Sequence, residues 1–252
     1  MIKLINVTKE YLKPTKSLIP FSNKGSIKAV DNISFSCSPS KIFTLLGPNG
    51  AGKTTTLRMI ATILKPTSGE IKVCNNDVLD SPEIVRKKIG FLTGNTGLYD
   101  RLTPNEMIDY FARLNQIDEQ KLFQNKLELF DLLEINEFKN QRIGTLSTGM
   151  KQKVSIARTI IHDPDVIIFD EPTSGLDILT AKNILELIKS CKEKGKTVIF
   201  STHRMSEVRM LAEDLAIIHK GKMLFNNTFQ HFISEYSEDF ENEFLKLMEA
   251  NN

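Results

Sequence analysis

The segment Gly47–Thr54 constrains this chain more than any other part of the sequence. It reads GPNGAGKT and matches every fixed position of the phosphate-binding pattern GxxxxGK[ST]. An apolar segment, Ile42–Leu46, precedes it, and a helical pattern, Thr55–Leu64, follows. Glycines allow backbone N–H groups to converge on phosphate oxygens, and a helix N-terminus adds positive potential. The spacing therefore predicts a strand, a loop and a helix that bind the phosphates of a nucleotide.

Two side chains of this loop have specific expected roles. Lys53 can reach the β- and γ-phosphates, and the Thr54 hydroxyl can ligate Mg²⁺. A chance glycine-rich turn is the alternative, and the strand–loop–helix context disfavours it. The expected nucleotide contacts in this segment are Gly47, Pro48, Asn49, Gly50, Ala51, Gly52, Lys53, Thr54 and Thr55.

Acidic residues follow a second apolar segment, Val166–Phe169. Asp170, at the end of this predicted strand, can hold magnesium through water. Glu171 would then stand next to the γ-phosphate, where a carboxylate can act as general base toward the attacking water. A helix start with two acidic residues is the alternative, and Pro172 argues against it.

His203 follows a third predicted strand, Thr197–Ser201. Ligands of open α/β sheets bind at the carboxyl ends of the strands, so we expect His203 to contact the γ-phosphate. A structural histidine is the alternative, since a lone histidine is more often structural than catalytic.

The alternation of short Ile-, Val- and Phe-rich segments with helical patterns indicates an α/β fold with a largely parallel sheet. The stretch from Thr103 to Phe138 has apolar residues at helical spacing and is predicted to be a helical insertion. Leu215–His219 and Lys222–Phe225 flank Lys220-Gly221 and predict a hairpin. The tail carries Phe240, Phe244, Leu247 and Met248 on one helical face, which we expect to pack on its own domain.

Composition narrows the class of protein further. The chain has 252 residues, and its 33 Lys and Arg nearly balance 31 Asp and Glu, so no basic surface argues for nucleic-acid binding. The three cysteines are far apart in sequence, as in reduced cytosolic proteins. No apolar run reaches the roughly 18 residues of a membrane span. Work at a membrane would therefore need another chain as anchor.

The segment Leu146–Gln152 reads LSTGMKQ and resembles the LSGGQ-type signature of ATP-binding cassette (ABC) proteins. With Ser174–Asp177 after Glu171, the motif order over residues 1–225 is similar to that of the family. The resemblance implies the ABC ATPase fold: a P-loop core, an N-terminal antiparallel β portion and an inserted helical subdomain. It implies one cassette domain, residues 1–252, with a core (1–98 and 150–225), a helical signature subdomain (99–149) and a short helical tail (226–252).

The family resemblance also implies an assembly. Two copies would pair head to tail, with Ser147 and Gly149 contacting the ATP held by the partner copy and Asp177 at the subunit seam. The Ser147 hydroxyl is also suited to cap the following helix. Tyr11 matches the position where an aromatic ring stacks on adenine, with core packing as the alternative. The implied ligands are ATP and Mg²⁺, and the implied partner is a separate transmembrane permease at the cytoplasmic face of the membrane.

Two positions depart from the family pattern. Thr148 stands where the signature usually has glycine, and its Cβ narrows backbone freedom. Gly94 stands where the family has a glutamine, and Thr93 or Asn95 could replace that side chain through water. These departures resemble the sodium-extrusion (NatA-like) branch of bacterial exporter cassettes.

The leading hypothesis is therefore the ATP-hydrolysing subunit of an exporter. A soluble cassette ATPase of translation or DNA repair is a second class, but such proteins have fused cassettes or long coiled coils. An ATP-gated binding module with little hydrolysis is a third class; Glu171 and His203 oppose it, whereas Gly94 and Thr148 leave it open.

Overall fold

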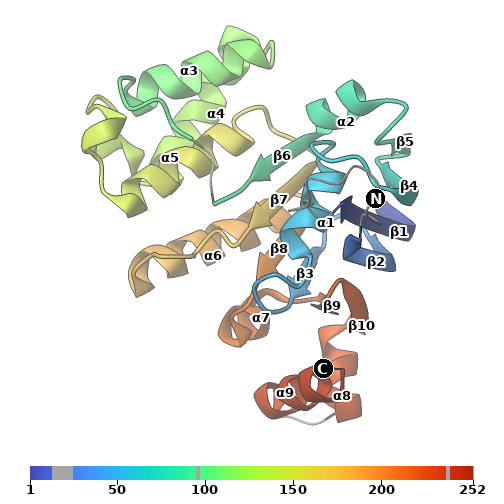
Figure 1. Ribbon diagram of the computed structural model, residues 1–252. Coiled ribbons are helices and arrows are strands. Elements are labelled where there is room, and N and C mark those ends of the chain that lie inside the picture. The colour runs from blue at the N-terminus through green and yellow to red at the C-terminus, as the bar shows by residue number, and fades with distance from the viewer. Residues whose placement is uncertain (13–24, 95–96, 237–238, 252) are drawn as a thin grey trace, which may run out of the picture. The chain divides into compact units, whose positions relative to one another are not determined.

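The computed structural model describes residues 1–12, 25–94, 97–236 and 239–251, and the chain divides into two compact units (Figure 1). The first unit comprises residues 1–38, 43–85 and 201–252. The second comprises residues 39–42 and 86–200. The phosphate loop belongs to the first unit, and the signature segment belongs to the second.

An antiparallel sheet forms the N-terminal part of the first unit. Its strand order is β2-β1-β4-β5, and the strands are β1 (Ile2–Leu12), β2 (Ser26–Cys37), β4 (Ser68–Val73) and β5 (Asn76–Asp77). Ile2 pairs with Cys37 on one side and with Val73 on the other. Alternate residues of β1 such as Ile2 and Leu4 are buried, which is the period-two pattern of a sheet with one face on the core. The predicted N-terminal antiparallel portion is confirmed.

Three further strands, β3 (Ile42–Leu46), β9 (Asp214–His219) and β10 (Lys222–Thr228), lie next to one another in the sheet that carries the phosphate loop, which begins directly after β3. β3 is buried at every position and runs parallel to β9. β10 returns antiparallel to β9 after Lys220 and Gly221, both with positive φ, so the predicted hairpin is confirmed. In the second unit β6 (Ile89–Leu92) and β7 (Val166–Asp170) pair in parallel. The predicted α/β class with mostly parallel pairing is therefore confirmed.

The phosphate-loop helix is shorter and begins earlier than the sequence indicated. The pattern predicted a helix over Thr55–Leu64, whereas α1 spans Lys53–Ile60. The helix ends at Ile60, Ala61 is its C-cap, and the next residue, Thr62, has a φ of 61° that a right-handed helix cannot contain.

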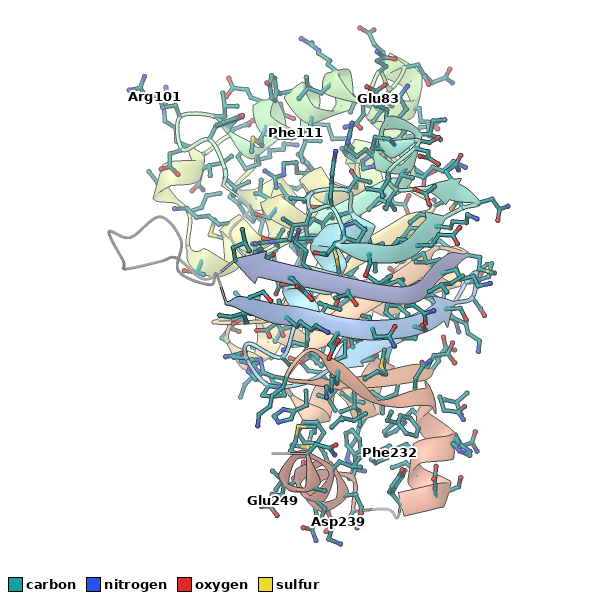
Figure 2. The ribbon with its side chains drawn as sticks, turned by 45° about the vertical axis from the view of Figure 1, so that its right-hand side comes forward. Glu83, Arg101, Phe111, Phe232, Asp239 and Glu249 are labelled. Carbon is teal, nitrogen blue, oxygen red and sulfur yellow. The ribbon has the colours of Figure 1, made fainter. Side chains whose placement is uncertain are left out.

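The C-terminal tail forms two helices that pack on the first unit. α8 (Phe229–Tyr236) and α9 (Phe240–Ala250) share a buried apolar cluster with Val208 of α7 (Met205–Leu211). Figure 2 shows Phe232 between the two tail helices, where its ring meets the ring of Phe240 edge-on at 5.2 Å. Phe244 and Met248 are buried and Leu247 is partly buried in the same cluster, as the helical pattern predicted.

Helices dominate the second unit (Figure 1). They are α3 (Pro104–Leu114), α4 (Glu119–Leu132), two 3₁₀ turns (Ile135–Glu137 and Ile143–Thr145), α5 (Thr148–Ile160) and α6 (Ile178–Glu193). Two further elements have residues in both units: α2 (Pro82–Lys88), which precedes β6, and β8 (Thr197–Thr202), which follows α6. Thr103 begins α3 with a capping box, because its hydroxyl accepts the Glu106 N–H at 3.2 Å and the Glu106 carboxylate accepts the Thr103 N–H at 2.8 Å. The predicted helical insertion between Thr103 and Phe138 is confirmed.

No helix in the described part of the chain is long and apolar enough to cross a membrane.

Candidate nucleotide-binding and signature sites

The phosphate loop turns on glycines at points where a side chain would clash. Gly52 immediately precedes α1 with a φ of 109°, and a Cβ there would lie 2.5 Å from the Ala29 carbonyl oxygen. At Gly47 a Cβ would lie 2.2 Å from the Ile218 carbonyl oxygen. Helix α1 begins without a side-chain cap or a first-turn acidic residue within the described chain. Its N-terminal N–H groups and dipole therefore favour an anion at this loop.

The predicted phosphate contacts lie in two parts of the structure, the turn of the loop and the first turn of α1. Pro48, Asn49, Gly50 and Ala51 form the turn, whereas Lys53, Thr54 and Thr55 open α1. Lys53 is only 4% exposed, and its ammonium donates to the carbonyl oxygens of Gly47 at 2.7 Å and Pro48 at 3.1 Å. Both carbonyls belong to the loop, so the charge of Lys53 is held at the loop itself. A buried ammonium with such partners can form charge-assisted bonds to phosphate oxygens.

The turn that carries His203 is attached to the phosphate loop within the first unit. The Gly47 N–H donates to the carbonyl oxygen of Thr202 at 3.3 Å. Thr202 is the last residue of β8, and His203 follows it as an exposed residue. This bond brings the backbone of the predicted γ-phosphate contact next to the start of the phosphate loop.

Tyr11 lies near the end of β1, paired with Ile27 of β2. Its side chain is 40% exposed, and the Lys9 ammonium lies 5.4 Å from the ring centroid. The ring is therefore a surface ring of the first unit and not part of the core. Most of the long loop that follows it, residues 13–24, lies outside the described residues.

The acidic pair stands at the end of the buried strand β7 in the second unit. Asp170 is the last residue of the strand and is 5% exposed. Glu171 has a φ of 49°, a left-handed conformation that is uncommon for any residue with a Cβ. Its carbonyl oxygen accepts the Ser174 N–H at 3.1 Å, which closes the turn toward Asp177.

The signature segment and Asp177 lie together in the second unit. Ser147 caps α5, because its hydroxyl oxygen accepts the Met150 N–H at 3.2 Å. Asp177 caps α6 by accepting the backbone N–H of Thr180 at 2.9 Å. Gly149 faces Thr180, since a Cβ on this glycine would lie 3.3 Å from the Thr180 methyl group.

These two helix starts line one groove of about 310 Å³, which we call the signature groove. Its lining residues are Ser147, Thr148, Gly149, Met150, Lys153, Gly175, Leu176, Asp177 and Thr180. The N-terminus of α5 gives one side of this groove positive potential, whereas the Lys153 ammonium pairs with Glu134 and the Asp177 carboxylate at the start of α6 carries negative charge. Thr180 was not among the residues predicted from sequence, because its contact with Gly149 depends on how two separate helices pack.

The two departures from the family pattern, Thr148 and Gly94, both fall where the backbone tolerates a change. Thr148 is exposed in the first turn of α5, so its Cβ meets no conformational barrier there. Gly94 is exposed in the turn after β6, and among the described residues no heavy atom beyond its chain neighbours lies within 4 Å of where its Cβ would be. Asn95, one expected substitute for the missing glutamine, lies outside the described residues. Thr93 is half-buried and directly follows β6.

Comparison with known proteins agrees with this arrangement. The family described as "ABC transporter" matches residues 30–174. The ABC transporter ATP-binding protein NatA of Bacillus subtilis (strain 168) is 41% identical over 89% of this chain and 92% of its own length. The bacitracin transport ATP-binding protein BcrA of Bacillus licheniformis is 36% identical over 82% of this chain and 67% of its own length.

A solved structure extends the comparison to the fold and the nucleotide. It is a dimeric ATP-binding cassette in a post-hydrolysis state, bound to ADP and Pi. Its TM-score to this chain is 0.79 at 29% identity, over 90% of this chain and 98% of that one. The chain therefore belongs to the ABC transporter family. It is the ATP-binding subunit of an ABC transporter and hydrolyses ATP.

Proposed function

We propose that two copies of this chain bind ATP between them, head to tail, and that closure of the pair drives export through a separate permease. The signature groove is the observation that carries this proposal. The N-terminus of α5, capped by the Ser147 hydroxyl, opens onto it, and backbone N–H groups at a helix start bind phosphate oxygens. In the related dimeric cassette the bound molecules are ADP and Pi. Ser147 and Gly149 would contact the ATP of the partner copy, with Asp177 at the seam.

The residues of the phosphate loop and of the strand ends would divide the work of hydrolysis. Lys53 binds the β- and γ-phosphates, and backbone N–H groups of the loop and of the first turn of α1 surround them. Glu171 accepts a proton from the attacking water, and His203 contacts the γ-phosphate. Tyr11 stacks on adenine, which its exposed ring permits.

Thr54 and Asp170 would hold Mg²⁺. A hydroxyl at the start of α1 and a carboxylate at the end of a buried strand are the hard oxygen donors that this ion prefers. The ion supplies positive charge that neutralises the phosphate oxygens during hydrolysis. Asp170 is buried, so its carboxylate would reach the ion from a fixed backbone position.

The exposed apolar side chains of the helical unit support docking of a membrane partner. Tyr99 is 52% exposed and Tyr110 is 44% exposed, and their rings meet edge-on at 6.0 Å. Leu114, at the end of α3, is 60% exposed. Exposed apolar groups of this kind mark surfaces that bind other proteins. We place the chain at the cytoplasmic face of a membrane through this surface, bound to two permease chains.

Sodium is the first cargo to test. The departures at Gly94 and Thr148 resemble the sodium-extrusion branch, and NatA shares 41% identity with this chain. A hydrophobic drug is the second, since BcrA is a bacitracin transport protein. Vesicles that hold a candidate permease, with this chain on their outer face, should accumulate ²²Na⁺ on addition of Mg-ATP, because an exporter moves its cargo away from the face that binds ATP. A bacitracin-type peptide would serve as the competing cargo.

The dimer proposal predicts that hydrolysis depends on protein concentration. The ATPase rate per chain should rise with concentration until dimers saturate, because each composite site needs two copies. A rate per chain that is constant over a wide range of dilution, with the protein monomeric throughout, would contradict it. A soluble role is less well supported, since both named relatives are transport proteins.

A further inference from the structure

A buried carboxylate lies next to the turn that carries His203. Glu207 belongs to α7 and is only 4% exposed, a position that is costly for a charge without compensating bonds. Its Oε2 accepts a hydrogen bond from the Thr202 hydroxyl at 2.5 Å. Its Oε1 lies 3.5 Å from Nη1 of Arg204. The residues on both sides of His203 therefore bind the same carboxylate.

The Thr202 hydroxyl also orders the backbone around His203. It accepts the N–H of Arg204 at 3.0 Å while it donates to Glu207. The Thr202 carbonyl oxygen accepts the N–H of Gly47 in the phosphate loop at 3.3 Å. The backbone atoms that flank His203 are thus held from two directions, by Glu207 through the hydroxyl and by the phosphate loop through the carbonyl.

The geometry points to Glu207 as a positioning residue for His203, an inference that rests on the proposed contact of His203 with the γ-phosphate. Glu207 would not touch nucleotide. Its carboxylate fixes the rotamer of Thr202, and the Thr202 hydroxyl in turn fixes the Arg204 N–H. The backbone of His203, between these two residues, is therefore held in one position relative to the phosphate loop. A hydrogen bond from a hydroxyl to a carboxylate is short and stronger than one to a neutral acceptor, which suits this task.

Three variants separate positioning from folding. Glu207→Gln keeps the shape but weakens the bond, Thr202→Val removes the hydroxyl, and Thr202→Ser retains it. We expect Glu207→Gln and Thr202→Val each to lower kcat about tenfold with KM for ATP within about twofold of wild type, because binding lies with the loop and not with this turn. Thr202→Ser should recover most of the rate. The matched control is Glu235→Gln on α8, an exposed carboxylate that is outside the site.

A double-variant cycle with His203→Ala supplies the decisive readout. If Glu207 acts only through His203, Glu207→Gln should change the residual rate of His203→Ala protein less than about twofold. A general loss of structure would instead lower the rate by the same factor in both backgrounds. Equal factors in both backgrounds, or wild-type kcat in Glu207→Gln and Thr202→Val alike, would overturn the inference. If Glu207→Gln fails to fold, Thr202→Val and Thr202→Ser carry the same cycle.

The outcome for His203→Ala separates this inference from the proposed function. If that variant hydrolyses ATP at the wild-type rate, the proposed role of His203 is wrong, and the positioning role of Glu207 falls with it. If His203→Ala loses activity while Glu207→Gln and Thr202→Val do not, only the positioning role is wrong.

Discussion

Asp177 binds Thr180 twice: its carboxylate accepts the backbone N–H at 2.9 Å and the hydroxyl at 2.7 Å. The first bond starts α6, and the second holds the Thr180 side chain against Gly149 of the signature segment. A single aspartate therefore both begins a helix and shapes the signature groove. This double role explains how a residue at a proposed subunit seam can also affect the stability of its own chain.

Asp177→Asn removes the negative charge of this helix cap and keeps the shape of its side chain, so it should show how much the charge contributes to the free energy of unfolding. The N–H and hydroxyl of Thr180 lower the pKa of the Asp177 carboxyl below its ordinary value. A lowered folded-state pKa contributes stability that is complete above about pH 5 and is lost as the pH falls below about 4. The asparagine variant should lack this contribution. Urea unfolding at about pH 6 and at about pH 3 should show a difference in unfolding free energy between wild type and variant that is smaller at the lower pH. A gap that is equal at both values would contradict the assignment.

Lys53→Ala should weaken nucleotide binding, since a charge-assisted contact to the phosphates disappears. Bonds of this class contribute about 1.5–3 kcal/mol, so the Kd for ATP should rise about tenfold or more. Titration with a fluorescent nucleotide measures it, and circular dichroism checks that the fold persists. Lys182→Ala, which removes an exposed lysine on α6, is the control and should bind normally. Unchanged affinity in Lys53→Ala would show that this lysine does not bind phosphate.

Local patterns were sufficient to predict the strand–loop–helix around Lys53, the buried strand before Asp170 and the helical insertion. Each depends on residues close in sequence, such as the capping pair Thr103 and Glu106. The contacts of Thr180 with Gly149 and of Glu207 with Thr202 could not be predicted in that way. They depend on how one element packs on another, and polar residues in a helix or at a strand end look ordinary in sequence.

The positive φ angles of Glu171 and Thr62 could not be predicted from the sequence either. Glu171 has a left-handed φ although no glycine marks the turn. The early end of α1 depends on Thr62, whose type gives no stop signal. Both conformations are imposed by surrounding structure, which local propensity does not contain.

Gly94→Gln tests whether the missing glutamine limits catalysis. The space around Gly94 is open, so the change should alter the unfolding free energy by no more than about 0.5 kcal/mol. An amide oxygen there can serve as a ligand of Mg²⁺, so hydrolysis should saturate at a lower magnesium concentration. Gly94→Ala, which adds only the Cβ, is the matched control. Identical magnesium dependence in wild type, Gly94→Ala and Gly94→Gln would show that this position takes no part in metal binding.

Ser147→Arg should block closure over the partner's ATP, because a bulky cation would occupy the helix N-terminus that a phosphate approaches. Nucleotide binding by the single chain should persist, since the phosphate loop keeps its residues. Ser147→Ala, which removes only the cap, separates the steric effect from lost capping. Mixing Ser147→Arg with Lys53→Ala protein should restore part of the ATPase rate, because one composite site of the mixed pair carries neither change. Normal hydrolysis by Ser147→Arg alone at every concentration would exclude the trans contact.

The mass of Glu171→Gln protein in Mg-ATP tests the ATP-bound head-to-tail pair most directly. The amide keeps the side-chain shape but cannot accept the proton of the attacking water, so ATP should remain bound between two copies. Light scattering after size exclusion should give twice the monomer mass with Mg-ATP and the monomer mass with Mg-ADP. The double variant that carries both Glu171→Gln and Lys53→Ala should keep the monomer mass in Mg-ATP. Turnover should fall by about a hundredfold or more. A Glu171→Gln protein that stays monomeric with Mg-ATP and hydrolyses it at the wild-type rate would contradict the account.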